Sequence, residues 1–162
     1  METIITVATI LAMYMNAGTA NGSQFFYNAD MEDGRITTLY VYNKSGEQLD
    51  RKFEYRYTYD EADRLTSKEV LKWNGVTGEW ERSYRLQLSY NEQGYTVERS
   101  LWSSRDEAYM PADEMAIYKY EFSHLLSVNY LKRSNADHQY ELIDNMLLMN
   151  PKNDLLLADV MR

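Results

Sequence analysis

A tyrosine, a polar turn and an apolar run recur in this order along the chain, and this repeat constrains the fold more than any other feature. Three copies read "VYNKSGEQLDRKF" from Val41, "TYDEADRLTSKEVLKW" from Thr58 and "SYNEQGYTVERSLW" from Ser89. A fourth and more divergent copy, "KYEFSHLLSVNYLK", begins at Lys119. Repetition of a short unit predicts serial copies of one supersecondary structure, each completed by its neighbours.

The polar segment of each copy has the composition of a tight turn. Asn43-Lys44-Ser45-Gly46 and Asn91-Glu92-Gln93-Gly94 begin with Asn and end with Gly, as a type I turn prefers. Asp60-Glu61-Ala62-Asp63 places Asp63 in the position of the glycine, and Asp tolerates the left-handed conformation better than most residues. These four letters also spell a helicase motif. A helicase needs a glycine-rich phosphate-binding loop, which the sequence lacks, so we interpret the segment as a turn.

The segments that flank the turns alternate with the period of a β-strand. In residues 53–59 four aromatic side chains fall on one face, while Glu54, Arg56 and Thr58 fall on the other. Residues 84–90 and 118–122 repeat this alternation. Such strands are typical of an antiparallel sheet with one apolar face and one wet face. We therefore expect an all-β fold, an antiparallel meander of repeated hairpins with seven to nine strands of ordinary length over residues 36–150.

The ends of the chain differ from the repeats. Residues 1–20 resemble a secretory signal peptide, because an apolar run ends in Ala17-Gly18-Thr19-Ala20, although no Lys or Arg precedes the run. The alternative is a buried first strand or helix. We assign residues 21–35 to a linker and residues 151–162 to a C-terminal tail, which forms either a short helix or a final strand.

Length and composition exclude several classes of protein. A chain of 162 residues forms one domain with a core. The net charge of −8 repels a phosphate backbone, so we expect no nucleic-acid partner. The absence of Cys excludes disulfides and a lipid anchor at the cleavage site, and the apolar run is too short for a stable membrane anchor. Fifteen Tyr against four Phe suggest a thin fold whose inner face lies near solvent.

The repeats carry a resemblance to known proteins. The stretch "YDEADRLTSKEVLKWNGVTGEWERSYRLQLSYNEQG", residues 59–94, together with the signal-like N-terminus, is similar to the secreted DUF3836 family of Gram-negative gut commensals. The hairpin units also resemble the YD repeats of Rhs-type shells. The resemblance implies a β-hairpin fold and a secreted or periplasmic location. The family has no assigned activity, so the resemblance implies no catalytic residue.

The residues offer little for catalysis or metal binding. His124 and His138 lie in different polar segments without a nucleophile motif or a metal-ligand spacing, so we expect no catalytic residue, no metal and no cofactor. Acidic pairs occur at Glu79/Glu81, Asp106/Glu107 and Asp113/Glu114, and a glycosidase would need such a pair across a cleft. The acidic turn at residues 60–63 could offer oxygen ligands to calcium, but lacks the EF-hand spacing.

Aromatic residues at the ends of the predicted hairpins are the best candidates for binding. An aromatic ring can stack on the C–H face of a sugar, while neighbouring polar groups bond its hydroxyls. The alternative is that the rings form cross-strand pairs that only stabilise the sheet. The candidate ligand-binding residues are Trp73, Trp80, Trp102, Tyr84, Tyr95 and Tyr109.

These observations favour a non-enzymatic protein that binds a glycan or another protein, or acts as a scaffold, at the cell envelope. Two alternatives stay open. One is a glycan-active hydrolase that uses an Asp/Glu pair. The other is an assembly subunit that pairs through an open sheet edge, including with itself.

Overall fold

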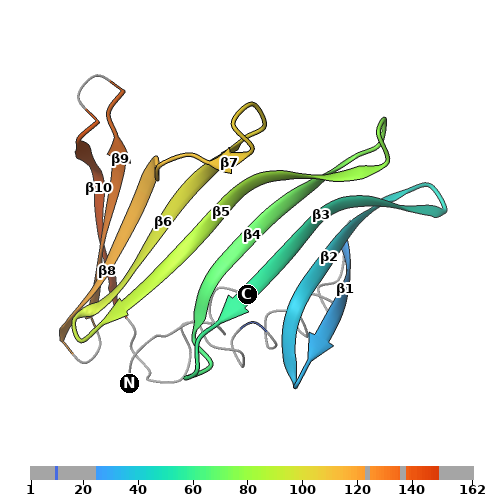
Figure 1. Ribbon diagram of the computed structural model, residues 1–162. Helices are drawn as coiled ribbons and strands as arrows, with labels where there is room; N and C mark the ends of the chain where they lie inside the picture. The colour runs from blue at the N-terminus through green and yellow to red at the C-terminus, as the bar shows by residue number, and fades with distance from the viewer. Residues whose placement is uncertain (1–9, 11–24, 123–124, 136–137, 150–162) are drawn as a thin grey trace. The chain divides into compact units, whose positions relative to one another are not determined.

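The computed structural model describes residues 10, 25–122, 125–135 and 138–149, and those from residue 25 onward form antiparallel β-strands joined by turns (Figure 1). Ten strands lie in these residues, against the seven to nine expected, and one of them has only two residues. The described residues contain no helix long and apolar enough to cross a membrane. The strands are β1 (Phe25–Glu32), β2 (Arg35–Ser45), β3 (Gln48–Tyr59), β4 (Leu65–Asn74), β5 (Glu79–Asn91), β6 (Gly94–Ser103), β7 (Ala108–Tyr109), β8 (Glu114–Phe122), β9 (Leu125–Arg133) and β10 (Tyr140–Met149).

The strands belong to two compact units, and the boundary between them falls within β5, after Arg85. In the first unit β1, β2, β3, β4 and the start of β5 are paired in chain order. In the second unit the rest of β5, then β6, β8, β9 and β10 follow in chain order, and β7 pairs with β6. This order is that of a meander and confirms the predicted fold class. Apart from Ile10, the predicted signal peptide lies outside the described residues, as does the whole C-terminal tail.

The sheet begins earlier than residue 36. Residues 25–32, which fall in the segment assigned to a linker, form β1 and pair with β2. Asp33 and Gly34 join the two strands with φ angles of 49° and 76°. An Asp-Gly dipeptide with two positive φ angles is typical of a two-residue hairpin turn, whose twist matches that of the strands. This dipeptide was the local signal for the additional hairpin.

The turn at residues 60–63 has the predicted conformation. Asp63 has a φ of 59°, which is the left-handed region that a glycine would otherwise occupy. The carboxylate of Asp60 accepts hydrogen bonds from the backbone N–H of Ala62 and of Arg64, both at 2.9 Å. The "DEAD" letters therefore form a hairpin turn.

The first unit buries residues on both faces of its sheet. Leu39, Tyr55 and Val70 lie side by side on β2, β3 and β4, and Leu39 and Val70 are buried. On the opposite face Glu54 is only 4% exposed and lies beside Leu71, which is also buried. The expectation of a wet outer face is therefore wrong at Glu54. Glu54 is buried because its direct partners on the neighbouring strands, Tyr40 on β2 and Leu71 on β4, have large side chains.

The second unit packs around stacked tyrosines. Tyr95 on β6 and Tyr118 on β8 are direct partners, with ring centroids 4.4 Å apart and planes inclined by 8°. Leu126 and Val128 on β9 are buried in the same unit. Gly94, with a φ of 146°, lies so close to β8 that a Cβ atom there would be 1.9 Å from the carbonyl oxygen of Tyr118. Only glycine allows this approach.

Candidate functional site

Two of the candidate tryptophans meet at the β4–β5 hairpin. Trp73 lies near the end of β4 and Trp80 near the start of β5, with ring centroids 5.0 Å apart and planes at 68°. The Asn74 side chain fixes the turn between them, because its Oδ1 accepts the backbone N–H of Val76 at 2.9 Å. Both rings are half-buried. The hairpin therefore presents an edge-to-face aromatic pair that is still reached by solvent.

Neighbouring side chains enlarge this pair into a cluster. The Tyr40 ring centroid lies 6.4 Å from that of Trp80. The guanidinium carbon of Arg51 lies 4.6 Å from the centre of the Trp73 ring, which is a cation–π contact. We call Tyr40, Arg51, Trp73 and Trp80 the tryptophan cluster. The Arg51 guanidinium therefore covers one face of the Trp73 indole.

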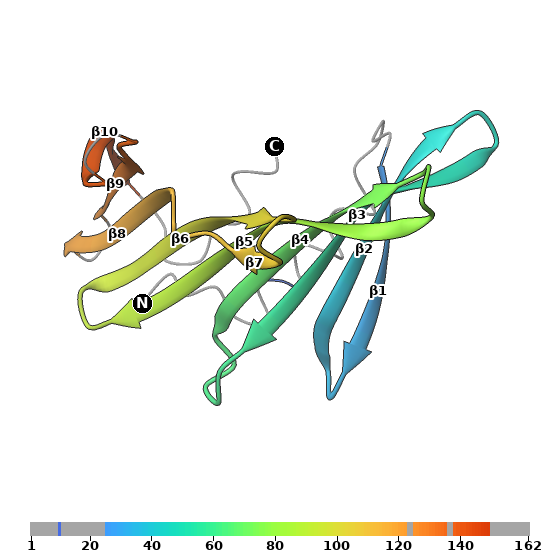
Figure 2. The ribbon, with the colours of Figure 1, turned by 45° about the horizontal axis from the view of Figure 1, so that its top comes forward.

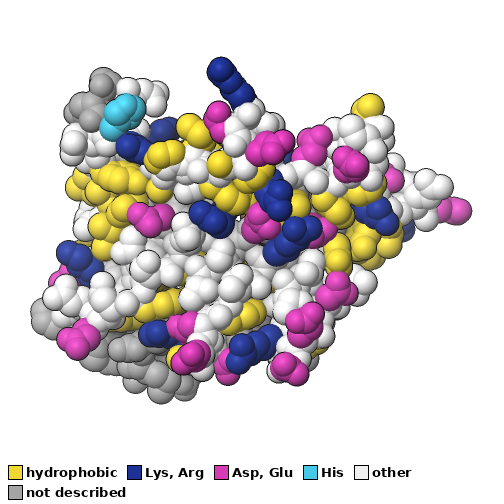
Figure 3. All heavy atoms as spheres, in the orientation of Figure 1, with side chains coloured by type: hydrophobic (Ala, Val, Ile, Leu, Met, Phe, Trp, Pro, Cys, Tyr) yellow, Lys and Arg dark blue, Asp and Glu magenta, His cyan; other side chains and the backbone are white. Residues whose placement is uncertain are grey.

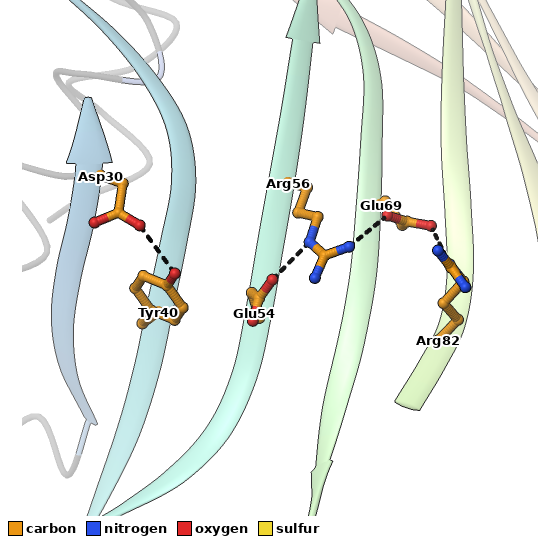
Figure 4. A network of polar contacts seen from close by, with 6 residues as sticks. All are labelled: Asp30, Tyr40, Glu54, Arg56, Glu69 and Arg82. Carbon is orange, nitrogen blue, oxygen red and sulfur yellow. Dashed lines mark hydrogen bonds and ion pairs between the residues drawn. The ribbon is translucent and has the colours of Figure 1, made fainter. Parts of the chain in front are cut away.

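A polar network lies on the same strands as the cluster (Figure 4). Nε of Arg56 lies 2.6 Å from Oε1 of Glu54, and Nη1 of Arg56 lies 3.7 Å from Oε2 of Glu69. Nε of Arg82 lies 3.0 Å from Oε1 of Glu69, so the ion pairs connect β3, β4 and β5. These carboxylates are engaged with arginines from their own sheet, and the network ties three strands together.

Beside the network, the Tyr40 hydroxyl donates a hydrogen bond of 2.9 Å to Oδ2 of Asp30. This hydrogen bond, together with burial and the nearby charge of Asp30, raises the pKa of Tyr40. The tyrosine of the cluster is therefore held by β1 and is neutral at physiological pH.

A groove lies beside the first residues of β3, which precede the part of the strand that pairs with β4. Residues 48–56 of β3 pair with β2, but the pairing with β4 starts only at Phe53, opposite Lys72. Figures 1 and 2 show the ends of the β2–β3 and β4–β5 hairpins as separate projections. Between them lies a cavity of about 540 Å³, which we call the hairpin groove. Its lining residues are Asn43, Asp50, Arg51, Lys52, Phe53, Lys72, Trp73 and Gly75.

The remaining candidate aromatics are placed in different surroundings. Trp102 on β6 and Tyr109 on β7 form a second edge-to-face pair, with centroids 5.0 Å apart and planes at 71°. Both are half-buried. Tyr95 is buried against Tyr118, and Tyr84 on β5 is half-buried in the first unit. The structure thus brings together Trp73 with Trp80 and Trp102 with Tyr109, while Tyr84 and Tyr95 join neither pair.

Asp60, Asp113 and Glu114, three of the acidic candidates, are engaged by neighbouring arginines. Asp113 and Glu114 both bind Nη2 of Arg99, at 2.5 Å and 2.9 Å, and the hydrogen bond from Arg99 lowers the pKa of Asp113. The backbone N–H of Arg64 is the main cause of the lowered pKa of Asp60 in its turn. His138 is exposed, and His124 lies outside the described residues. Within the part of the chain that the structure describes, no group of three or more His, Cys, Asp or Glu is placed to hold a metal ion.

Sequence reasoning missed the most exposed apolar segment of the sheet. Strand β10 pairs with β9, and the described strands include no partner on its other side. Five of its apolar side chains are 39–63% exposed, namely Leu142, Ile143, Met146, Leu147 and Leu148. The signal was present as an apolar run without alternation, which does not suit a strand with one wet face.

Comparisons with known proteins place the chain in a family. A family described as "Family of unknown function (DUF3836)" matches residues 1–120. A solved protein of unknown function from Bacteroides fragilis is 26% identical, covers 83% of this chain and 97% of its own, and superposes with a TM-score of 0.69. A solved DUF3836 family protein from Bacteroides vulgatus is 25% identical over 54% of this chain and 90% of its own, with a TM-score of 0.53.

A third solved structure, a DUF3836 family protein from Parabacteroides distasonis, shares the fold with 15% identity and a TM-score of 0.51, over 79% of this chain and 92% of its own. The comparison with curated proteins finds no match. The likeness to YD repeats stays a prediction. The family match and the common fold together show that this chain belongs to the DUF3836 family.

Proposed function

We propose that the protein is a non-enzymatic scaffold of the cell envelope that assembles with a second copy of itself along β10. The observation that carries this proposal is the row of exposed apolar side chains on an edge strand of ten residues. An edge strand offers unpaired backbone N–H and C=O groups, which natural sheets usually protect with charges, prolines or short strands. Strand β10 has only Glu141 and Asp144 as charges and contains no proline.

The sequence of β10 suits pairing with itself. In an antiparallel pairing centred on Met146, Asn145 lies opposite Leu147 and Asp144 lies opposite Leu148. The carboxylate of Asp144 therefore does not face its own copy across the two-fold axis. Such an interface is isologous, so one surface serves both partners and the assembly closes as a dimer. The irregular register near Ile143 limits the pairing to the second half of the strand.

The experiment is a measurement of molar mass by size exclusion with light scattering over a wide range of protein concentration. We expect a dimer whose melting temperature rises with concentration, because association stabilises the folded state by mass action. Leu147→Lys should give a monomer, since it places two like charges near the axis. Val76→Lys is the matched control, because it adds the same charge at a side chain that is 96% exposed in the β4–β5 turn and is not part of β10. A wild-type monomer at every concentration would contradict the proposal.

Export to the periplasm or beyond is the second part of the proposal. It is supported by the signal-like residues 1–20 and by the resemblance to a secreted family. Cell fractionation followed by N-terminal sequencing tests it. The expected result is an envelope or medium fraction whose chain starts at Asn21, and a cytoplasmic protein that keeps residues 1–20 would contradict it.

A glycan ligand is the second candidate function, and the tryptophan cluster favours it. Trp73 and Trp80 are half-buried rings at a hairpin end, beside a groove with polar groups. A hydrolase is less well supported there, because Asp50 is the single carboxylate among the residues that line the groove. A thermal-shift panel of neutral and acidic glycans tests the candidate, with Trp73→Ala as the variant that should lose binding. A flat panel would contradict it.

A further inference from the structure

We propose that the hairpin groove binds an acidic carbohydrate, a sugar chain that bears carboxylate or sulfate groups. This inference deepens the second candidate function and rests on it. It concerns the charge of the ligand, which the tryptophan cluster alone does not specify.

The side chains that line the groove carry a net positive charge, whereas the whole protein has a net negative charge. The chain has a net charge of −8, yet Arg51, Lys52 and Lys72 face the groove with Asp50 as the one carboxylate. All three cationic side chains are exposed, so their charged groups are within reach of a ligand. Figure 3 shows acidic and basic side chains interspersed over the face that it displays, so a local excess of one sign is unusual for this surface.

Within the described residues, the cations of the groove form no ion pair with a carboxylate. Ion pairs engage Arg35, Arg56, Arg64, Arg82 and Arg99. No ion pair among the described residues involves Arg51, Lys52 or Lys72. A cation without a carboxylate partner can bind an anionic ligand without first breaking an ion pair.

The backbone is shaped to present these side chains. The register between β2 and β3 shifts at Lys52, because Arg51 pairs with Tyr42 while Phe53 pairs with Val41. The extra residue makes a β-bulge, and bulges are used near binding sites to redirect side chains. Arg51 is in addition held over the Trp73 ring, which leaves the N–H donors at the rim of the guanidinium available to an oxyanion.

The other lining groups favour a sugar over an acidic peptide. Phe53 and Trp73 give the groove aromatic surface against which the C–H groups of a pyranose can pack. The Asp50 carboxylate only accepts hydrogen bonds, and sugar hydroxyls supply donors that Asp and Glu side chains lack. The volume of about 540 Å³ lies within the range of small-ligand sites.

The test compares charged and neutral forms of one glycan. The probes are an oligogalacturonate and its fully methyl-esterified form, which keep the same length and linkage and differ in charge. A sulfated galactose oligomer distinguishes sulfate from carboxylate, and an oligoglutamate peptide of equal charge measures charge alone. Affinities are taken by calorimetry on the full chain, at two salt concentrations because charge-driven binding is screened by salt.

We expect the oligogalacturonate or the sulfated oligomer to bind about tenfold more tightly than the methyl ester. Lys72→Gln should weaken this binding about threefold, as for an exposed ion pair, and Lys52→Gln with Lys72→Gln about tenfold. Lys119→Gln is the matched control, because it removes an exposed lysine from β8 and should change nothing. Melting curves establish that each variant is folded.

Three results would overturn the inference. Equal binding of the methyl ester would leave a glycan-binding protein without preference for charge. The oligoglutamate could bind as tightly as the acidic glycan, or Lys119→Gln could weaken glycan binding as much as Lys72→Gln does. Either result would mean that binding depends on the general charge of the ligand and not on the groove. If no acidic probe binds at concentrations up to about 1 mM, the inference of an acidic ligand is wrong. The neutral glycans of the thermal-shift panel then test separately whether the protein binds a glycan at all.

Discussion

The carboxylate of Glu54 lies 2.6 Å from Nε of Arg56, two residues along the same strand, and Glu54 is only 4% exposed. A buried carboxylate is tolerated when its charge is paired. Arg56→Met would leave Glu54 buried and unpaired, and we expect a loss of about 2–4 kcal/mol in the free energy of unfolding. Urea denaturation measures it.

The double variant Glu54→Leu with Arg56→Met should recover much of that loss, since an apolar pair removes the unpaired charge. Arg105→Met, in an exposed turn, is the control and should stay within about 0.5 kcal/mol of the wild type. If Arg56→Met were as stable as the control, the ion pair would not hold Glu54 in place.

Gly94 should be the least replaceable of the described glycines. Gly94→Ala forces a Cβ atom to within 1.9 Å of a backbone oxygen on β8, so β6 and β8 must separate. We expect a cost of about 2–4 kcal/mol or a failure to fold. Gly75→Ala is the matched control, because nothing lies within 4 Å of a Cβ atom there. Thermal melts of both variants test the contrast, and equal stability would show that the strands adapt.

Alkaline pH should unfold the first unit through its tyrosines. Burial raises the pKa of Tyr59 to about 12 from 10.0, and its hydroxyl donates a 2.8 Å hydrogen bond to the carbonyl of Ile36. A folded-state pKa above the unfolded value stabilises the fold below pH 10.0 and loses this contribution as the pH rises toward 12. Phenolate absorbance followed together with circular dichroism should reveal late ionisation that coincides with unfolding. Tyr59→Phe should weaken that coincidence, whereas early titration of all tyrosines would contradict it.

Acid should act on the second unit through Asp113. The hydrogen bond from Arg99 lowers the pKa of Asp113 below 3.8, so its contribution to stability is present above that pH and is lost as the pH falls through the folded-state value. Asp113→Asn should therefore reduce stability at neutral pH and flatten the dependence of stability on pH below about 4. Denaturant midpoints at several pH values measure both effects. If Asp113→Asn loses stability below about pH 4 as steeply as the wild type, other carboxylates cause the acid sensitivity.

Local chemistry determined what could be read from the sequence. The left-handed Asp63 was predictable because a turn leaves few residue types able to adopt a positive φ. The pairing of Trp73 with Trp80 was within reach, since both belong to one hairpin. The burial of Glu54 was not, because it depends on Leu71 and Tyr40 from neighbouring strands, whose register the sequence does not display.

Contacts made across longer stretches of chain were equally hidden. Arg99 binds Asp113 across the connection that includes β7, and nothing in the sequence near residues 113–114 indicates this ion pair. The hairpin groove depends on where the pairing of β3 with β4 starts and on a bulge at Lys52, and neither has a signature in composition.

The meander has a consequence for how the chain reaches its folded state. Nearly every strand in each unit pairs with the strand that precedes or follows it, so the loops closed on folding are short and the contact order is low. If the chain is exported with its N-terminus first, as proposed above, β1 can therefore close on β2, and then β3 on β2, while later segments are still in transit. Folding of this kind proceeds with the direction of translocation and needs no residue that has yet to arrive.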